Sequence, residues 1–401
     1  MINLSLEFNK KGWKNCTLGD IVTFKRGFDL SKDEMAEGQY PVVGSNGIIG
    51  YHNEFTTDAP GITIGRSGNV GLPFLIKEPS WSHNTTLFIQ EFKNVDPYFI
   101  YYFLKTIDLK QFAGGSAVPT LNRNHIHPIE IIIPEDIKEQ KKIARILLQI
   151  DEKIELNKQI NHNLETIMKK IYVNWFEDFE PFRNDEFYDT KLGKIPVGWK
   201  VKPLQEFIKF QEGPGIRNWQ YVEEDGVNFL NIRCIQNNDL ILDTANMISK
   251  EEAEGKYSHF MLNEWDIVIS SSGTLGRYAI VRKEHLPLCL NTSIIRFAPK
   301  HSFNHYSYVY SYLTSRGFYH YLLTMGSGSV QLNFGPTHLK QIDLIVPPEE
   351  VLNRYNDLIL PLIEKMTSLK SEIDQLSKLR DTMLPKLMSG ELNVSKINCD
   401  L

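Results

Sequence analysis

Residues 62–71 read ITIGRSGNVG and residues 267–276 read IVISSSGTLG, so the chain contains the same strand and Ser-Gly loop twice. The repetition extends further, because the tripeptide GWK at 12–14 returns at 198–200. The two copies of this tripeptide are 186 residues apart. The units of solenoid repeats are only ~20–50 residues long, so this spacing indicates duplication of a whole domain. The sequence therefore predicts two related globes in one chain.

Each globe is expected to end in an apolar strand closed by proline, at 129–134 and at 342–347, and a helical pattern follows each strand. The predicted order is globe, helix, globe, helix, with an α+β fold overall. The expected segments are globe 1 over 1–134, a central helical spacer over 135–185, globe 2 over 186–348 and a C-terminal helical spacer over 349–401.

The composition indicates a folded protein of ordinary globular type. A length of 401 residues with 42% hydrophobic and 23% charged residues supports two or three domains with real cores. No signal peptide and no apolar run of about 18 residues is apparent, so we expect a cytoplasmic protein. Four cysteines are scattered without a C-x-x-C pair, which argues against a zinc site and a disulfide framework: Cys16, Cys234, Cys289 and Cys399.

The net charge is −5, which bears on nucleic-acid binding. A protein that held DNA alone through non-specific charge should be basic. If this chain reads DNA, it is expected to do so through local basic patches, with partner proteins adding affinity.

Two series of residues at alternating steps of three and four predict long helices with a seam. The first seam is Ile143, Ile146, Ile150, Lys153, Asn157, Ile160, Leu164, Ile167 and Ile171. The second seam is Leu352, Tyr355, Ile359, Leu362, Met366, Leu369, Ile373, Leu376, Arg380 and Met383. Such seams favour an intramolecular antiparallel coiled coil with a pseudo-two-fold axis. Two alternatives stay open: helices that each pack on their own globe, and homodimerisation through one seam.

Four positions interrupt this helical pattern. Lys153 and Asn157 are polar seam residues, which cost stability and tend to fix register or partner. Pro361 is expected to kink the second helix or to mark its true start, and Pro385 is expected to end it.

The globes alternate short apolar strands with turns, which predicts mixed α and β structure. Strands are expected at 40–43, 61–64, 129–133, 265–269 and 342–346. Aromatic-rich helices are expected at 97–105 and 306–315.

The Ser-Gly loops are candidate DNA contacts. Glycine lets the backbone approach a phosphate, which N–H groups and hydroxyls then hold. Arg66 and Arg277 stand at the two loops, where a guanidinium can contact phosphate or guanine. The alternative interpretation is a hairpin turn in which glycine supplies positive φ.

A second polar loop recurs at 114–125 and 326–334. Asn and Arg read adenine and guanine edges with paired hydrogen bonds, although Asn also caps turns. Together the loops give the candidate DNA-binding residues Lys25, Arg26, Arg66, Ser67, Asn69, Asn122, Arg123, Asn124, Arg217, Ser271, Ser272, Thr274, Arg277 and Asn333.

Motifs for catalysis are missing from the sequence. It contains no Asn-Pro-Pro-Tyr/Phe methyl-transfer motif, no phosphate loop of the G-x-x-x-x-G-K-[ST] type and no H-E-x-x-H. We therefore expect no catalytic residues, no metal and no cofactor bound by this chain.

The chain resembles the specificity (S) subunit of type I restriction–modification systems, often written HsdS. The resemblance covers essentially the whole chain and rests on the order and spacing of several weak motifs. These are Gly12-Trp13-Lys14 with 18–21, Pro196-Val197-Gly198-Trp199-Lys200 with Leu204, 272–276, the two Pro-ended strands, and LRDTMLPKLMSGEL at 379–392.

The resemblance implies that each globe is a target-recognition domain that reads one half of a bipartite site in double-stranded DNA. The helices would set the spacer between the half-sites and dock two methyltransferase (M) subunits, which carry S-adenosylmethionine. Two restriction (R) subunits can join such a complex, bringing ATP and Mg²⁺, and no membrane is involved.

Two other functions remain alternatives. One is the recognition subunit of a type IIB or type IIG-like restriction system, in which recognition and methylation are arranged differently. The other is a two-headed coiled-coil adaptor with no role in DNA binding.

Overall fold

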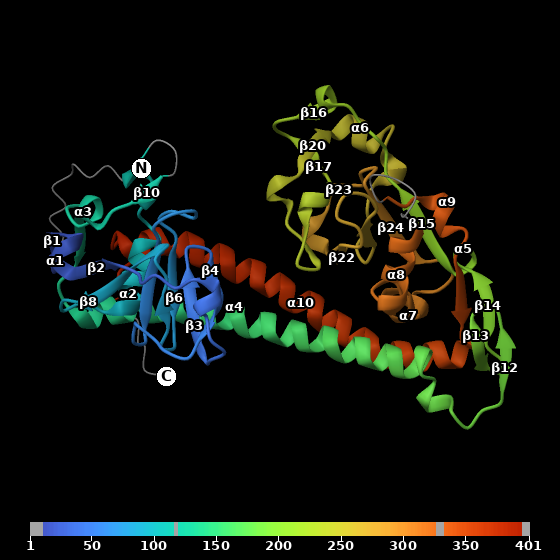
Figure 1. Ribbon diagram of the computed structural model, residues 1–401. Coiled ribbons are helices and arrows are strands. Elements are labelled where there is room, and N and C mark those ends of the chain that lie inside the picture. Colours follow the sequence, from blue (N-terminus) through green and yellow to red (C-terminus); the bar gives the residue numbers. More distant parts are fainter. Residues whose placement is uncertain (1–10, 116–118, 326–332, 395–401) are drawn as a thin grey trace. The chain divides into compact units, whose positions relative to one another are not determined.

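A computed structural model describes residues 11–115, 119–325 and 333–394. The chain divides into two compact units (Figure 1). Unit 1 comprises residues 1–155 together with 374–401, and unit 2 comprises residues 156–373. Each unit therefore contains one globe and one segment of each long helix.

The core of unit 1 is a four-stranded antiparallel sheet in the order β2-β8-β5-β6. These strands are β2 (Val22–Arg26), β8 (Thr86–Phe92), β5 (Gly61–Gly65) and β6 (Pro73–Ile76). A three-stranded sheet follows the order β4-β3-β7, built from β4 (Gly47–His52), β3 (Tyr40–Gly44) and β7 (Trp81–Ser82).

Short elements complete unit 1. Two strand pairs are β1 (Trp13–Thr17) with β11 (Glu130–Pro134), and β9 (Ala113–Gly114) with β10 (Thr120–Leu121). The helices are α1 (Leu18–Ile21), α2 (Pro97–Leu104) and α3 (Arg123–Ile126).

The corresponding sheet of unit 2 has the order β15-β24-β21-β22. Its strands are β15 (Ile208–Glu212), β24 (Ile294–Pro299), β21 (Ile267–Ser270) and β22 (Tyr278–Ile280). A second sheet follows the order β16-β20-β17-β23, with β16 (Tyr221–Val222), β20 (Asn246–Ser249), β17 (Gly226–Phe229) and β23 (Leu288–Cys289).

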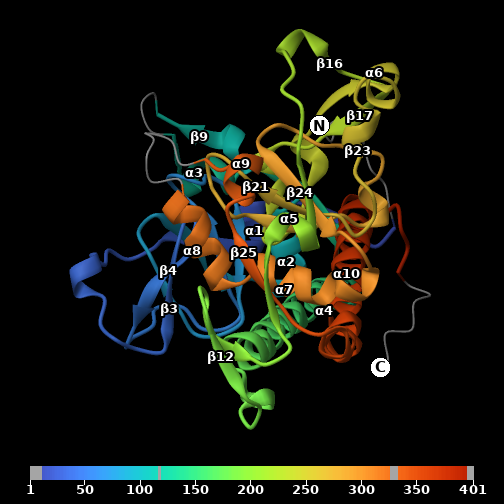
Figure 2. The same cartoon turned by 90° about the vertical axis from the view of Figure 1, so that its right-hand side faces the viewer.

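The remaining pairs of unit 2 are β12 (Phe187–Thr190) with β13 (Gly193–Pro196), β14 (Lys200–Pro203) with β25 (Asp343–Val346), and β18 (Ile235–Gln236) with β19 (Asp239–Leu240). The helices are α5 (Leu204–Phe207), α6 (Lys250–Glu254), α7 (Tyr306–Leu313), α8 (Arg316–Met325) and α9 (Pro336–Leu339). Figure 2 labels several of these elements in a second view. The two units repeat one sheet topology, so the predicted duplication and α+β class are confirmed.

Two long helices, α4 (Ile137–Tyr172) and α10 (Glu349–Met388), contribute to both units. In unit 1, Arg380 Nη1 lies 2.8 Å from Asp151 Oδ1. In unit 2, the ring centroids of Trp175, just after α4, and Tyr355 are 5.5 Å apart. The end of one helix therefore lies beside the start of the other, and the pairing within each unit is antiparallel, as predicted.

The first helix turns a different face inward from the one predicted. Lys153 and Ile167 are exposed, Ile167 by 46%, so their assignment to the seam was wrong. Ile146 and Ile160 are half-buried. The buried positions are each one residue further along: Leu147, Ile154, Asn161 and Met168. Both series have heptad spacing, so only the packing of neighbouring elements could separate them.

The remaining predicted positions of the first seam form one row that belongs to both the predicted and the observed inner face of α4. These positions, and all positions of the second seam, are buried or half-buried. The first row is Ile143, Ile150, Asn157, Leu164 and Ile171. The second seam keeps all ten predicted positions, including Ile359, Leu362, Met366, Leu369, Ile373 and Leu376. The predicted positions of α10 therefore face inward, although Ile363, outside the series, is also fully buried.

Helix α10 continues through both prolines. It begins at Glu349, so Pro361 does not mark its start, and the prediction that Pro385 ends it was wrong. The Pro385 carbonyl accepts a hydrogen bond from Ser389 N at 2.9 Å, which extends the helix by a turn. Gly390, at φ +70°, then provides the left-handed residue that commonly follows a helix end.

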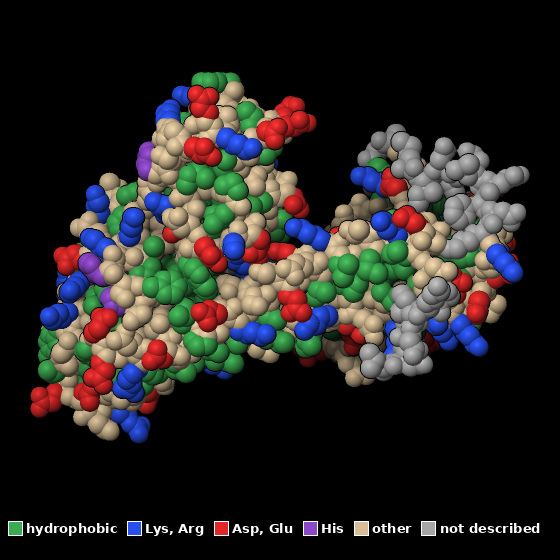
Figure 3. Space-filling view, turned by 180° about the vertical axis from the view of Figure 1, so that it is seen from behind, with side chains coloured by type: hydrophobic (Ala, Val, Ile, Leu, Met, Phe, Trp, Pro, Cys, Tyr) green, Lys and Arg blue, Asp and Glu red, His purple; other side chains and the backbone are tan. Residues whose placement is uncertain are grey.

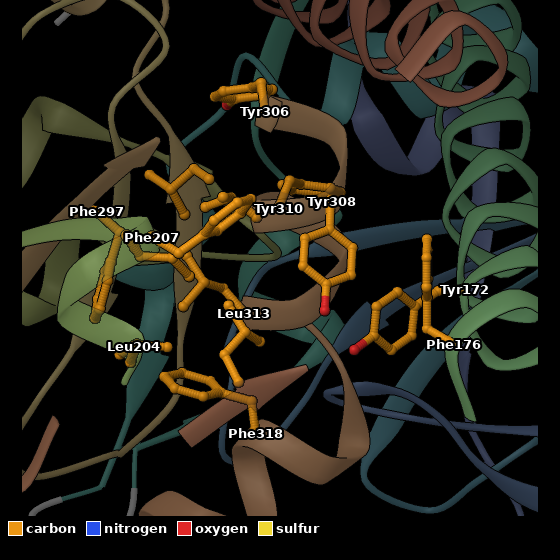
Figure 4. Packing of buried hydrophobic residues seen from close by; sticks show 14 of the residues in the cluster. Tyr172, Phe176, Leu204, Phe207, Phe297, Tyr306, Tyr308, Tyr310, Leu313 and Phe318 are labelled. Carbon is orange, nitrogen blue, oxygen red and sulfur yellow. The ribbon is translucent and has the colours of Figure 1, made fainter. Parts of the chain in front are cut away.

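The long helices also pack on the globe of their unit. In unit 2, Tyr172, the last residue of α4, and Phe176, just after it, share a buried cluster with Tyr308 of α7 (Figure 4). In unit 1, Ile143 of α4 and Leu387 of α10 belong to the core of the first globe. Helix pairing and helix-on-globe packing, treated as alternatives in the sequence, therefore occur together.

Candidate nucleic-acid interface

Unit 1 contains an open hollow of about 600 Å³ where β2 and β5 end. It gathers six of the candidate residues: Lys25, Arg26, Arg66, Asn122, Arg123 and Asn124. Phe28, Asp29 and Thr120 also line it, and the sequence analysis did not single them out. Ser67 and Asn69 lie on the same loop as Arg66 but do not line the hollow.

Backbone hydrogen bonds bring these distant segments together. Arg66 N donates to Thr85 O at 2.8 Å, and Leu121 N donates to Arg66 O at 2.8 Å. Gly27 N donates to Thr86 O at 3.0 Å, which ties the end of β2 to the same place. The backbone of Arg66 is thus held on both sides, while its side chain faces the hollow.

The Ser-Gly loop turns back tightly after Arg66. Gly71 N donates to Gly65 O at 2.8 Å, and Gly68 has a φ of +84°. A Cβ at position 65 would lie 1.7 Å from Asn69 O, so only glycine fits there. The turn interpretation of these glycines is therefore correct for the loop itself, and it places Arg66 at the edge of the hollow.

The electrostatic character of the hollow is cationic. Its lining carries four cations and a single carboxylate, Asp29. Asn84 donates to Asp29, and this hydrogen bond is the largest cause that lowers the pKa of the carboxyl, with Arg26 adding to it. Arg26 Nη2 lies 2.8 Å from Asp29 Oδ1, but this ion pair is exposed and contributes little stability.

Two arginines of the hollow have no side-chain partner among the described residues. Neither Arg66 nor Arg123 forms a side-chain hydrogen bond or ion pair with any residue that the structure describes. Lys25 Nζ lies 5.3 Å from the centroid of the Phe28 ring. Asn122 partly serves as a helix cap, because its Oδ1 accepts from Asn124 N at 3.0 Å.

The same backbone frame occurs in unit 2. Ser271 N donates to Ser293 O at 2.9 Å, and Phe334 N donates to Ser271 O at 3.0 Å. Ser271 therefore occupies the place of Arg66, and Phe334 that of Leu121. Ser272 forms a bridge with Asn333, so these candidates are brought together. Ser271 is buried, whereas Thr274 and Asn333 are exposed.

The other unit 2 candidates lie apart from this frame. Ser270 N donates to Arg277 O, just as Gly65 N donates to Leu72 O, so Arg277 corresponds to Leu72 and not to Arg66. Arg277 Nη1 donates to Ile235 O at 3.4 Å and lines a separate hollow of about 300 Å³ with Asn237 and Asn238.

Arg217, also a candidate, is exposed on the loop that leads to β16. Residues 326–332, which make up most of the second polar loop predicted at 326–334, lie outside the described residues.

The surface of unit 2 mixes charges of both signs. On the face that Figure 3 shows, Lys and Arg side chains are interspersed with Asp and Glu. Within residues 11–115, 119–325 and 333–394, no group of three or more His, Cys, Asp or Glu side chains is arranged to hold a metal ion. No helix in the same ranges has both the length and the apolar character needed to cross a membrane.

Two α+β units of one topology, of which the first presents unengaged arginines in an open hollow, define a duplicated recognition protein suited to an anionic polymer. The model of the type I restriction modification DNA specificity domain matches residues 10–166 and 196–377. The chain therefore belongs to the type I restriction–modification DNA specificity family.

Known proteins agree with this placement. The specificity subunit of the type I restriction enzyme MjaIX from Methanocaldococcus jannaschii is 32% identical over 338 residues, covering 77% of this chain and 73% of that protein. The MjaVIII specificity subunit of the same organism is 24% identical over 96% of this chain and 94% of its own length. The crystal structure of the type I S subunit from M. genitalium shares the fold, with a TM-score of 0.65 at 19% identity over 95% of this chain and 98% of that one.

Proposed function

We propose that the two units of this specificity subunit each read one half of a bipartite double-stranded DNA target. The single observation that carries the proposal is the hollow of unit 1, where Arg66 and Arg123 have no side-chain hydrogen bond or ion pair among the described residues. Arginine pairs with phosphate oxygens or with guanine O6 and N7, so such side chains suit a DNA ligand.

The α4–α10 pair would hold the units and dock the methyltransferase subunits. Several large apolar side chains on these helices point to solvent: Leu156, Ile167, Leu358 and Leu379, each exposed by about half. Outward apolar residues on a helix already paired through its inner face fit a protein partner. This also explains why Ile167 has a hydrophobic side chain although it lies outside the seam.

Chemistry would belong to the partner subunits. We propose that this chain catalyses nothing itself and binds no cofactor. S-adenosylmethionine would be bound by two M subunits, and ATP and Mg²⁺ by two R subunits where these are present. The net charge of −5 supports this division, because partners would add positive surface around the DNA.

A methylome tests the proposal. The chain would be expressed with its methyltransferase partner in a host free of DNA methylation, and N6-methyladenine mapped genome-wide. We expect one bipartite motif that disappears when this chain is omitted, the partner alone being the control. A single unsplit motif would favour a type IIB or IIG-like arrangement. A folded complex that methylates nothing would favour the adaptor function.

A further inference from the structure

We infer that the two units read base edges of opposite hydrogen-bonding character. Unit 1 would read acceptors, such as guanine O6 and N7, whereas Glu212 of unit 2 would accept a hydrogen bond from the exocyclic amino group of cytosine. This inference rests on the proposed function and adds the chemical class of base to it.

The strand register places Glu212 where unit 1 has Arg26. In unit 1, Arg26 pairs with Leu87 of β8, and Leu87 also pairs with Ile64 of β5. In unit 2, Glu212 pairs with Ile295 of β24, and Ile295 also pairs with Ile269 of β21. Arg26 and Glu212 therefore occupy equivalent positions in the strand pairing. Unit 1 has a cation at this position and unit 2 has a carboxylate.

The other cations of the unit 1 hollow are also replaced in unit 2. Lys25 corresponds to Gln211 by the same register, and Arg66 corresponds to Ser271. Arg123 is the first residue of α3, and the first residue of the equivalent helix α9 is Pro336. All four cations thus have uncharged or acidic counterparts, so the described residues of unit 2 offer no cation to guanine or phosphate at the equivalent positions.

Glu212 is positioned and free to accept a hydrogen bond. A Cβ built at Gly335 would lie 3.9 Å from Glu212 Oε2, so the carboxylate faces the loop before α9. It is half-buried and forms no hydrogen bond or ion pair with any residue in the described part of the chain. The partial burial raises the pKa of this carboxyl. Asp29 of unit 1, by contrast, is bound by Asn84 and Arg26.

Cytosine is the base that suits a lone carboxylate. An ionised carboxylate only accepts hydrogen bonds, and cytosine N4 is a donor with no acceptor of the same base beside it in the major groove. Adenine places the N7 acceptor next to its amino group, and guanine and thymine present O6, N7 or O4. A carboxylate repels these lone pairs, so it selects by rejection as well as by attraction.

The test compares motifs read by the intact complex of this chain and its methyltransferase partner, in a host free of DNA methylation. Three variants are mapped with the wild type: Glu212→Gln, Arg66→Gln and Glu206→Gln. Glu206 is the matched control, because it is an exposed acid of α5, before the opposite end of β15. Size-exclusion chromatography checks that each variant still forms the complex.

We expect Glu212→Gln to relax one C·G position of one half-site by roughly tenfold or more, since a good side-chain–base pair discriminates at about that level. Arg66→Gln should alter the other half-site, and Glu206→Gln should leave the motif unchanged.

A split wild-type motif that Glu212→Gln leaves intact, or alters at a position without cytosine, would overturn the inference while the proposed function stands. A wild type without a split motif would overturn the proposed function itself.

Discussion

At the scale of single residues, Arg66 connects fold and function most directly. Its backbone is fixed by hydrogen bonds to Thr85 and Leu121, so substitution of the side chain should leave the loop intact. We expect Arg66→Ala to weaken binding of one half-site by about 1–3 kcal/mol, the usual range for a good arginine–base contact. Competition binding by the assembled complex measures this, with the exposed Arg183→Ala as control. If affinity and target sequence are unchanged, Arg66 does not contact DNA and the loop is only a structural turn.

Asn157 is a buried residue whose polarity costs stability. Its side chain is fully buried, and neither its Oδ1 nor its Nδ2 has a hydrogen-bond partner among the described residues. We expect Asn157→Leu to raise the free energy of unfolding by about 1–2 kcal/mol, because the desolvation cost of the amide is removed. Urea denaturation measures the change, and the exposed Asn163→Leu should show none. A destabilised variant would indicate an ordered water or a register function at this site.

His285 should make stability depend on pH. Burial, and then the neighbouring Arg282, lower the pKa of His285 to about 4. The unfolded chain, with a pKa near 6.5, binds the proton first as the pH falls. Stability from this residue is therefore complete above pH ~6.5 and is lost towards pH ~4, by about 2–3 kcal/mol. Denaturation midpoints between pH 7 and 4 should fall less steeply in His285→Asn than in the exposed His162→Asn.

At the scale of elements, the two seams were not equally predictable. In α10 the predicted series is apolar except at Arg380, and the structure buries or half-buries every position of it. In α4 two neighbouring heptad series each contain one polar residue, Lys153 in one and Asn161 in the other, and the structure buries the series with Asn161. Burial by the globe of each unit decides between them, and no local spacing contains that information.

The outward apolar residues of the helices should bind the methyltransferase partner. Ile167 is 46% exposed, so Ile167→Glu should leave the fold unchanged. We expect the variant to weaken assembly with the methyltransferase subunit at least tenfold, since a charge would be buried at the interface. Size-exclusion chromatography or calorimetry reports the loss. Asn163→Glu adds the same charge at another exposed position of α4, and equal weakening by both variants would contradict a specific contact.

The candidate site was only partly predictable for a related reason. The sequence alone shows which arginines stand beside Ser-Gly loops, and Arg66 was predicted from it. Its neighbours in the hollow are set by long-range hydrogen bonds such as Leu121 N to Arg66 O. Glu212 was overlooked because an acid at a strand end resembles a solvated residue. The aligned segments FKRG at 24–27 and FQEG at 210–213 contained the signal.

At the scale of the whole molecule, lengthening the two helices tests whether they set the spacer between the half-sites. Seven residues inserted after 155 and seven after 373, where the units meet along the chain, would preserve the heptad pattern. At ~1.5 Å per residue and ~3.4 Å per base pair, we expect the spacer to grow by about 3 base pairs. Methylome mapping should show both half-sites unchanged. A change in the bases of either half-site would refute the hypothesis that the helices set only the spacer.

The division of the chain into two units has a consequence for folding during synthesis on the ribosome. Unit 2 is continuous in sequence, but unit 1 is completed by Leu387 and Met388, which are buried in its core. The first globe is therefore synthesised before the second, but its core is completed after it. Until α10 is synthesised, the apolar face of α4 that α10 covers is exposed. A stop codon placed before Leu387 would therefore damage the core of unit 1 and leave unit 2 continuous.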